Sequence, residues 1–192
     1  VSDLYGRIRA AADPARGWEL WRDTRDEMFR DHPRSPIDAA ARGSYSGVPL
    51  FEYDQGARYL VDVEGIDGAR EQIWNIGADG ELRLTPGLRT VGLSAALGDE
   101  VTIFQIQGYG GGLFLPFKDA TSGAETYGGG RYLIDAIKGA DLGTQAGKLV
   151  LDFNFSDHPS CRHSDAWVCP LAPSENIVPA AIRAGERMIS AT

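Results

Sequence analysis

Cysteine, histidine and methionine are scarce in this chain of 192 residues, which contains two cysteines, three histidines and two methionines. Two cysteines are too few for the disulfide framework of a small secreted domain, and they allow one bridge or free thiols in a reducing compartment. Three histidines offer few bases for a Ser-His-Asp triad, and the sequence has neither a G-x-S-x-G nor an H-E-x-x-H motif. The scarcity excludes a disulfide-rich scaffold and leaves the common hydrolase signatures unsupported.

Long apolar runs and an excess of positive charge are also missing. No stretch approaches the roughly 18 consecutive apolar residues of a transmembrane helix, so we expect no membrane span. Residues 1–12 lack a basic segment followed by an apolar one, so we expect no signal peptide there and a cytoplasmic location; the alternative is a signal removed before Val1. Acidic residues outnumber basic ones by 27 to 19, and the net charge of −8 predicts no nucleic-acid partner.

The length and the composition predict one domain. A chain of 192 residues is a little longer than a usual domain of about 150 residues, and no internal repeat or long linker interrupts it. We expect a single domain over residues 1–192. Its three parts are an N-terminal helical segment over 1–36, a β core over 45–156, and a cysteine-containing loop with a C-terminal helix over 157–192.

Helical patterns occur at both ends of the chain. Asp13-Pro14 predicts a helix start, with Asp as the N-cap and Pro in the first turn. The apolar residues that follow recur at helical spacing and predict a face docked on the core: Trp18, Trp21, Met28 and Phe29. Near the other end, Pro179 and the small residues Ala181, Ala184 and Gly185 predict a second helix packed closely on a sheet.

Apolar and polar residues alternate in short runs from about residue 45 onward. These runs predict about seven or eight strands, at 59–64, 73–76, 82–84, 88–93, 101–106, 113–117, 132–134 and 149–155. Ala78-Asp79-Gly80 is a hairpin signal. Close turns of this kind favour an antiparallel barrel or sandwich over βαβ units. We therefore expect an α+β fold, mainly antiparallel β, flanked by N-terminal and C-terminal helices.

Glycine-rich and metal-like motifs add little chemistry. In Gly108–Leu113 the third glycine of a G-x-G-x-x-G pattern is replaced by Leu113, and Gly128–Gly130 lacks the lysine of a phosphate-binding loop. Both predict turns rather than a nucleotide site. Four potential metal ligands have a spacing unlike the usual zinc motifs, so we expect no metal: His158, Cys161, His163 and Cys169.

Polar side chains concentrate between residues 113 and 176. Alternation along 149–155 predicts that Asp152 and Asn154 share one strand face, opposite Phe153 and Phe155. Upstream, glycine turns lie beside four further polar residues: Lys118, Glu125, Thr126 and Arg131. A guanidinium opposite an aspartate forms a bidentate pair, or a donor fork for a ligand carboxylate or phosphate. The stretch therefore predicts either a ligand pocket or an internal network of salt bridges and turns.

Several strings of this region resemble the signature of the DUF1684 family. They are LPFKDATSG at 115–123, ETYGGGRYL at 125–133, LDFN at 151–154, PSC at 159–161, CPL at 169–171, PSEN at 173–176 and IRAGE at 182–186. With RSPI at 34–37, the resemblance covers roughly residues 18–188. The resemblance implies a bacterial or archaeal protein of unknown function, and some members of the family are lipoproteins. It does not indicate which reaction, if any, the protein catalyses. His158 and His163 depart from the family pattern, which counts against a family zinc site.

The leading hypothesis is a pocket that binds a small polar or anionic molecule, with an enzymatic reaction left open. The residues assigned to ligand binding are Lys118, Thr126, Arg131, Asn154 and Asn176. Asp152 and Glu125 are the candidates for acid–base catalysis. The alternative is a non-catalytic binding or interaction module in which the same Arg/Asp/Asn cluster is structural. The sequence leaves cofactors and oligomeric state open.

Overall fold

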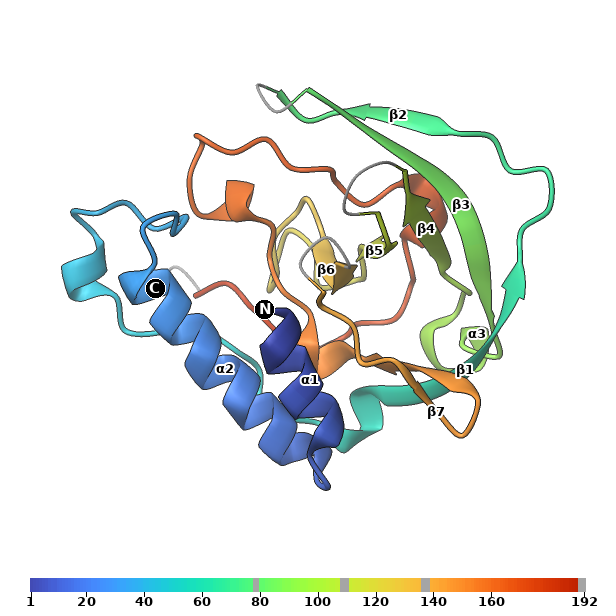
Figure 1. The fold of residues 1–192 in the computed structure, drawn as a ribbon, viewed down its shortest axis with the longest axis horizontal. Coiled ribbons are helices and arrows are strands. Elements are labelled where there is room, and N and C mark those ends of the chain that lie inside the picture. The colour runs from blue at the N-terminus through green and yellow to red at the C-terminus, as the bar shows by residue number, and fades with distance from the viewer. Residues whose placement is uncertain (78–79, 108–110, 136–138, 190–192) are drawn as a thin grey trace.

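Two helices form the N-terminal part of the computed structural model, which describes residues 1–77, 80–107, 111–135 and 139–189 (Figure 1). Helix α1 spans Ser2–Ala10 and α2 spans Pro14–Asp31. The side chain of Asp13 accepts a hydrogen bond from the backbone N–H of Ala15 at 3.0 Å, and Pro14 occupies the first turn of α2. The helix start predicted from Asp13-Pro14 is therefore confirmed.

Antiparallel strands make up one strongly curled sheet. The strands are β1 (Arg58–Gly65), β2 (Gln72–Asn75), β3 (Glu81–Val91), β4 (Thr102–Ile106), β5 (Leu113–Phe117), β6 (Arg131–Asp135), β7 (Thr144–Gln145) and β8 (Lys148–Asp152). Their order is β6-β5-β4-β3-β1-β8-β7, with β2 paired to β3, and a short helix α3 (Ser94–Leu97) joins β3 to β4. Beyond β8, Asp157 exchanges two backbone hydrogen bonds with Tyr132 of β6, of 2.9 and 3.0 Å. The sheet thus curls into a half-barrel, and the expected mainly antiparallel α+β fold is confirmed.

Two strand predictions need correction. The run at 82–84 and residues 88–91 of the run at 88–93 belong to one strand, β3, because the chain stays extended through a register shift between Pro86 and Leu88. Residues 92 and 93 lie beyond its end. The run at 149–155 is a strand only as far as Asp152, and Phe153–Phe155 form a 3₁₀ turn. Asp152 and Asn154 therefore do not share a strand face. The predicted hairpin turn at 78–80 and the glycines at 108–110 lie wholly or partly outside the described residues.

The predicted C-terminal helix is wrong. From Pro179 to Ile189 the described chain is irregular, with an isolated bridge between Glu186 and Leu50. Gly185 has a φ of +76°, which interrupts a right-handed helix. The backbone groups of this segment bond to the barrel instead, as in the 2.8 Å bond from the Glu186 N–H to the Ser156 carbonyl. The segment is a strap that lies across the barrel rather than a helix.

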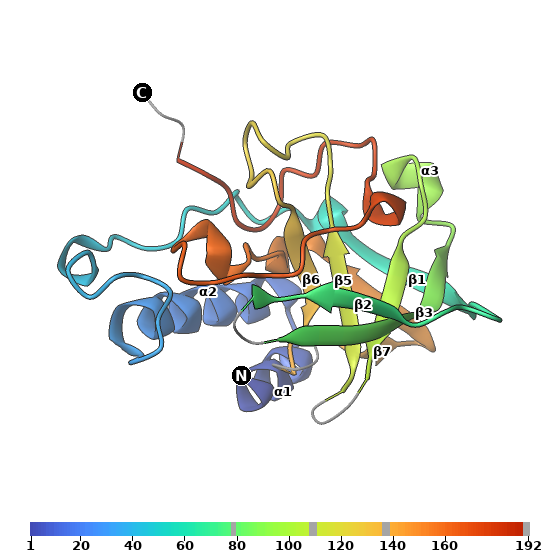
Figure 2. The ribbon, with the colours of Figure 1, turned by 90° about the horizontal axis from the view of Figure 1, so that it is seen from above.

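Apolar side chains form three buried clusters. The largest fills the half-barrel and includes Ile103, Leu115, Phe117, Leu151 and Phe153. A second covers the other face of the sheet: Leu84, Phe104, Ile106, Phe114 and Tyr132. The third joins the helices to the turn after β8: Leu4, Tyr5, Ile8, Trp18, Trp21 and Phe155. Figures 1 and 2 show α1 and α2 side by side at one side of the sheet. The helical layer and the half-barrel therefore meet along an interface that can hold a site.

Candidate functional site

A buried arginine connects the helical layer with the C-terminal strap. The Nε atom of Arg25, on α2, donates to the Glu186 carboxylate, whose side chain has no exposed surface. The other side of the Arg25 guanidinium lies 3.2 Å from the Asp157 carboxylate. Its carbon atom also lies 4.6 Å from the ring centre of Phe29. Two carboxylates and an aromatic ring thus hold this guanidinium in one place.

His158 completes the Arg25–Glu186 network. Its backbone N–H donates to Glu186 at 2.7 Å, and its ring Nδ1 lies 3.4 Å from the same carboxylate. The ring Nε2 accepts from the backbone N–H of Tyr127 at 3.2 Å, so the neutral ring carries its proton on Nδ1. Burial lowers the pKa of His158 to about 4. Burial raises the pKa of Glu186, but the charge and hydrogen bond of Arg25, together with the interactions of His158, outweigh burial and hold this pKa below its usual range.

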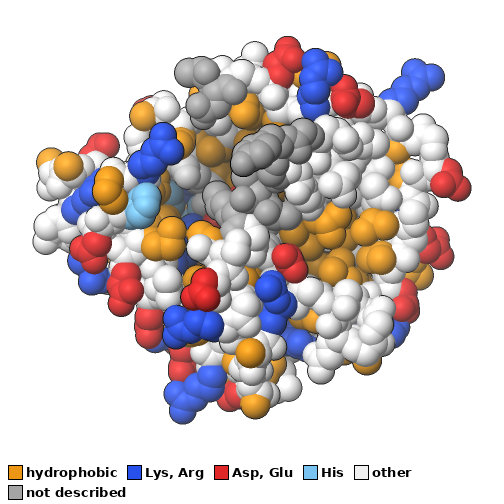
Figure 3. All heavy atoms as spheres, in the orientation of Figure 1, with side chains coloured by type: hydrophobic (Ala, Val, Ile, Leu, Met, Phe, Trp, Pro, Cys, Tyr) orange, Lys and Arg blue, Asp and Glu red, His pale blue; other side chains and the backbone are white. Residues whose placement is uncertain are grey.

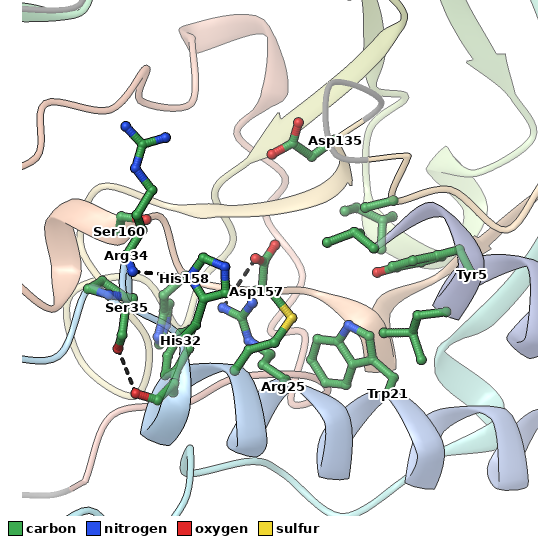
Figure 4. Close-up of a pocket in the computed structure, with 17 residues that line it drawn as sticks. Tyr5, Trp21, Arg25, His32, Arg34, Ser35, Asp135, Asp157, His158 and Ser160 are labelled. Carbon is green, nitrogen blue, oxygen red and sulfur yellow. Dashed lines mark hydrogen bonds and ion pairs between the residues drawn. The ribbon is translucent and has the colours of Figure 1, made fainter. Parts of the chain in front are cut away.

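A cavity of about 200 Å³ lies above this network, between the helices, the segment at 32–36 and β6. We call it the helix–barrel cavity; it is lined by Val1, Leu4, Tyr5, Trp21, Arg25, Met28, Phe29, His32, Arg34, Ser35, Pro36, Leu133, Asp135, Ala140, Asp157, His158 and Ser160. Figure 4 shows the carboxylates of Asp135 and Asp157 and the hydroxyl of Tyr5 pointing toward one space beside Trp21. The walls are therefore mainly apolar, and a few polar groups converge within them.

Two carboxylates, those of Asp135 and Asp157, line the helix–barrel cavity together with Arg25 and the exposed Arg34. The Arg25 guanidinium is already paired with Asp157 and with Glu186, which does not line the cavity. Burial and the neighbouring charge of Asp157 raise the pKa of Tyr5, so this hydroxyl keeps its proton at neutral pH. Because Arg25 is already paired, the inner wall formed by Asp135, Asp157 and Tyr5 accepts hydrogen bonds from a ligand more readily than it binds an anion.

Arg131, predicted to bind a ligand, lies deep in the protein with 1% of its side chain exposed. Its guanidinium donates to the backbone carbonyls of Ala184, Glu186 and Ile182, the last at 2.9 Å. The same group lies 3.4 Å from a carboxylate oxygen of Asp119. The structure thus pairs Arg131 with Asp119 and the C-terminal strap, and gives it no contact with Asp152.

On the same side of the barrel, Thr126 is connected to Arg131 through Thr121 and Asp119, whereas Lys118 and Asn176 have separate contacts. The hydroxyl of Thr126 lies 2.9 Å from that of Thr121, which bonds to Asp119. Asn176 is fully buried, donates to the carbonyls of Thr102 and Pro116 at 2.8 Å each, and accepts from the Thr102 N–H at 2.7 Å. Lys118 pairs through its backbone with the segment at 176–178.

The remaining predicted residues lie elsewhere. Glu125 forms a bidentate pair with Arg183 on the surface, with distances of 2.9 and 2.8 Å, and this pairing lowers its pKa. Asp152 accepts from the backbone and side-chain amides of Asn154. Asn154 in turn bonds to both backbone groups of Asp54. The structure therefore separates the predicted cluster into three groups, and none of its members lines the helix–barrel cavity.

Sequence reasoning missed Arg25, Asp135, Asp157 and Glu186. One signal was present for Arg25, because it lies four residues after Trp21 and four before Phe29, on the buried face of α2. A charge on such a face requires a buried partner. The partners themselves come from β6, the segment after β8 and the strap, and no local pattern connects those positions.

Neither a metal site nor a disulfide is built from the described residues. No group of three or more His, Cys, Asp or Glu side chains in this part of the chain has the arrangement of a metal site. Cys161 and Cys169 form no disulfide, and the backbone N–H of Cys161 lies 3.3 Å from the sulfur of Cys169. No helix among the described elements combines the length and the apolar character needed to cross a bilayer. On the face shown in Figure 3, acidic and basic side chains are mixed around the outline, and the right edge is mainly acidic.

Comparison with known proteins identifies the family. The model of the family described as "Protein of unknown function (DUF1684)" matches residues 43–187. A solved structure, the solution NMR structure of the uncharacterized protein from gene locus rrnAC0354 of Haloarcula marismortui, is similar at a TM-score of 0.60 and 28% identity. The match covers 91% of this chain and 96% of that one. No curated protein matches the chain. The chain therefore belongs to the DUF1684 family, as its sequence strings predict.

Proposed function

We propose that this protein binds a small molecule with an apolar ring and hydrogen-bond donors in the helix–barrel cavity. The observation that carries the proposal is the Asp157 carboxylate, one-fifth exposed and held by Arg25 at the floor of an aromatic-lined cavity. A carboxylate has about four acceptor positions, so Asp157 can accept a hydrogen bond from a ligand in addition to its contacts within the protein. The two carboxylates of the inner wall, Asp135 and Asp157, favour such a ligand over the anionic ligands that the sequence also allowed.

The size of the cavity supports a ligand with a single ring. An apolar protein cavity of about 150 Å³ is large enough to bind benzene. At about 200 Å³, the helix–barrel cavity has room for one six-membered ring with one or two polar substituents. Trp21 and Phe29 supply ring contacts at its wall, and Ser160 and Tyr5 supply hydroxyl groups.

We propose structural roles for three of the residues that the sequence assigns to ligand binding: Arg131, Asn154 and Asn176. Arg131, Asn154 and Asn176 are fully or almost fully buried, and their hydrogen bonds go to backbone groups or to neighbouring side chains. Buried groups satisfied in this way have little capacity left for a ligand. This supports a structural role for Arg131, Asn154 and Asn176, while the proposed ligand pocket is the helix–barrel cavity.

Three probes with the same ring test the proposed binding: benzylamine, benzyl alcohol and benzoate. We expect the amine and the alcohol to shift backbone amide signals near Asp157 and Asp135 in a saturable NMR titration, and benzoate to bind at least tenfold more weakly. Asp157→Asn should reduce the preference for the amine by about tenfold, which corresponds to about 1.4 kcal/mol.

The matched control is Asp62→Asn, which removes an exposed carboxylate paired with Lys148 and should leave the titrations unchanged. Met28→Trp narrows the rim of the cavity without changing its charge, and it should weaken the amine and the alcohol alike. The proposed function is wrong if benzoate binds as tightly as benzylamine, or if none of the three probes shifts the cavity amides.

A further inference from the structure

A second cavity, of about 340 Å³, lies where the α1–α2 junction meets the β7 edge of the sheet. We call it the Asp152 cavity; it is lined by Ile8, Arg9, Ala11, Ala12, Pro14, Arg58, Leu142, Thr144, Gln145, Val150, Asp152 and Phe155. It shares no lining residue with the helix–barrel cavity. Its charged residues are also different, because two arginines and one carboxylate line it. The Asp152 cavity is therefore a separate candidate site with its own set of charged groups.

Asp152 has one carboxylate oxygen in use and one without a hydrogen bond. Oδ1 accepts from the backbone N–H of Asn154 at 3.1 Å and from its side-chain amide at 2.8 Å. Oδ2 is buried and accepts no hydrogen bond from any described residue; the Nε atom of Arg58 lies 3.7 Å away. An unpaired buried acceptor is unfavourable in the free protein. Because Oδ1 fixes the orientation of the carboxylate, a donor that enters the cavity can satisfy Oδ2.

The two arginines of the Asp152 cavity retain unused donors. Arg58 donates through one Nη atom to Gln145 at 2.9 Å, and Arg9 donates through one Nη atom to the Asp141 carbonyl at 2.8 Å. Their other N–H groups donate to no residue within the described ranges. Arg58 is 20% exposed and Arg9 39%, so both can be reached from solvent. A guanidinium fork matches the geometry of a carboxylate.

We propose that the Asp152 cavity binds a small carboxylic acid that carries an α-amino or α-hydroxyl group. The ligand carboxylate lies on Arg9 and Arg58, and its ammonium or hydroxyl group donates to Asp152 Oδ2. Ile8, Leu142 and Phe155 give the cavity an apolar wall that accommodates a branched aliphatic side chain. The net charge of the three ionic residues is positive, which favours a ligand with a carboxylate over a simple amine.

Four ligands that differ in one group test the binding mode: leucine, 2-hydroxy-4-methylpentanoate, 4-methylpentanoate and 3-methylbutylamine. In NMR titrations we expect the first two to shift amides at Gln145, Val150 and Asn154 in a saturable way. The acid without a donor and the amine without a carboxylate should bind at least tenfold more weakly. The leucine and hydroxy-acid titrations distinguish an ammonium from a hydroxyl as the group that donates to Asp152.

Two variants separate binding from folding. Asp152→Asn keeps an oxygen for the Asn154 contacts, and it should weaken leucine at least tenfold. Arg9→Gln changes a partly exposed side chain outside the core, and it should weaken both carboxylate ligands that carry a donor. Asp157→Asn, in the other cavity, is the matched control and should have no effect here. The inference is overturned if no ligand shifts these amides in the folded protein, or if Asp152→Asn binds leucine as the unaltered chain does.

Discussion

Arg131 donates hydrogen bonds to backbone carbonyls of the C-terminal strap. In a helix these carbonyls would accept from backbone N–H groups of the same segment. Three carbonyls of the strap and the Asp119 carboxylate lie on one buried guanidinium. Arg131→Met should therefore lower the free energy of unfolding by about 3–5 kcal/mol, because it leaves Asp119 buried without its cation. For a chain of this size we expect the melting temperature to fall by more than about 10 °C.

The matched control is Arg183→Met, which removes an exposed partner of Glu125 and should leave the melting temperature close to that of the unaltered protein. A small effect of Arg131→Met, equal to that of the control, would contradict a structural role for Arg131.

His158 should make stability depend on pH in a defined range. Burial lowers its pKa to about 4 in the folded protein, against about 6.5 in the unfolded chain. Between these values only the unfolded chain binds the proton, so stability is full above pH 6.5 and falls as the pH drops toward 4. The corresponding loss is about 3 kcal/mol. Urea unfolding of His158→Gln between pH 4 and 7 should show a clearly shallower slope than the unaltered protein.

Burial also lowers the pKa of His163, which therefore contributes a slope of the same sign. The same urea experiment on His163→Gln measures how much of the pH dependence of stability comes from His163. If His158→Gln keeps the full slope and His163→Gln loses it, the assignment of the titration to His158 is wrong.

Between elements, the contact of the strap with the turn after β8 depends on one glycine. Gly185 has a φ of +76°, and a Cβ added there would lie 2.5 Å from the Ser156 carbonyl oxygen and 2.8 Å from that of Phe153. Both are backbone atoms, so the strap itself would have to move. We expect Gly185→Ala to destabilise the protein by about 3 kcal/mol or more, measured by urea unfolding.

Gly68→Ala is the matched control, because Gly68 also has a positive φ, of +68°, but a Cβ there meets nothing within 4 Å. The free energy of unfolding of Gly68→Ala should fall by only about 1 kcal/mol, the cost of a positive φ for a residue with a Cβ atom. Equal losses in the two variants would show that the close contact at Gly185 is unimportant.

For the whole molecule, the contacts between layers predict one cooperative unfolding transition. The Trp18 indole donates to the Asn154 carbonyl at 3.0 Å, and the Trp21 and Phe155 rings lie 5.6 Å apart. The buried Arg25–Glu186 pair adds a third connection between the helices and the rest of the chain. Urea transitions followed by the helical far-UV circular dichroism signal and by the backbone amide NMR signals of β4 and β5 should coincide. Loss of the helical signal before the loss of the strand signals would mean that the helical layer unfolds separately.

Local patterns were sufficient for the elements whose formation depends on near neighbours. The Asp13-Pro14 start and the apolar face of α2 follow from helix capping and helical spacing, and alternating residues predict β1, β4 and β5. The family strings are also local, and the family match confirms them. For the strap, Ile182, Ala184 and Glu186 are all buried at a spacing of two, so the same residues fitted an extended chain as well as a helix.

Tertiary structure alone decided which buried charges meet. Arg131 pairs with Asp119 rather than Asp152, and Arg25 meets Asp157 and Glu186, which lie more than a hundred residues further along the chain. The half-barrel and the strap bring these groups together, and no periodicity of two or 3.6 residues encodes such distances. Each buried charge needs a partner, but the sequence does not identify it, because several carboxylates could serve. The chemistry of both cavities therefore emerged only when the layers were placed against each other.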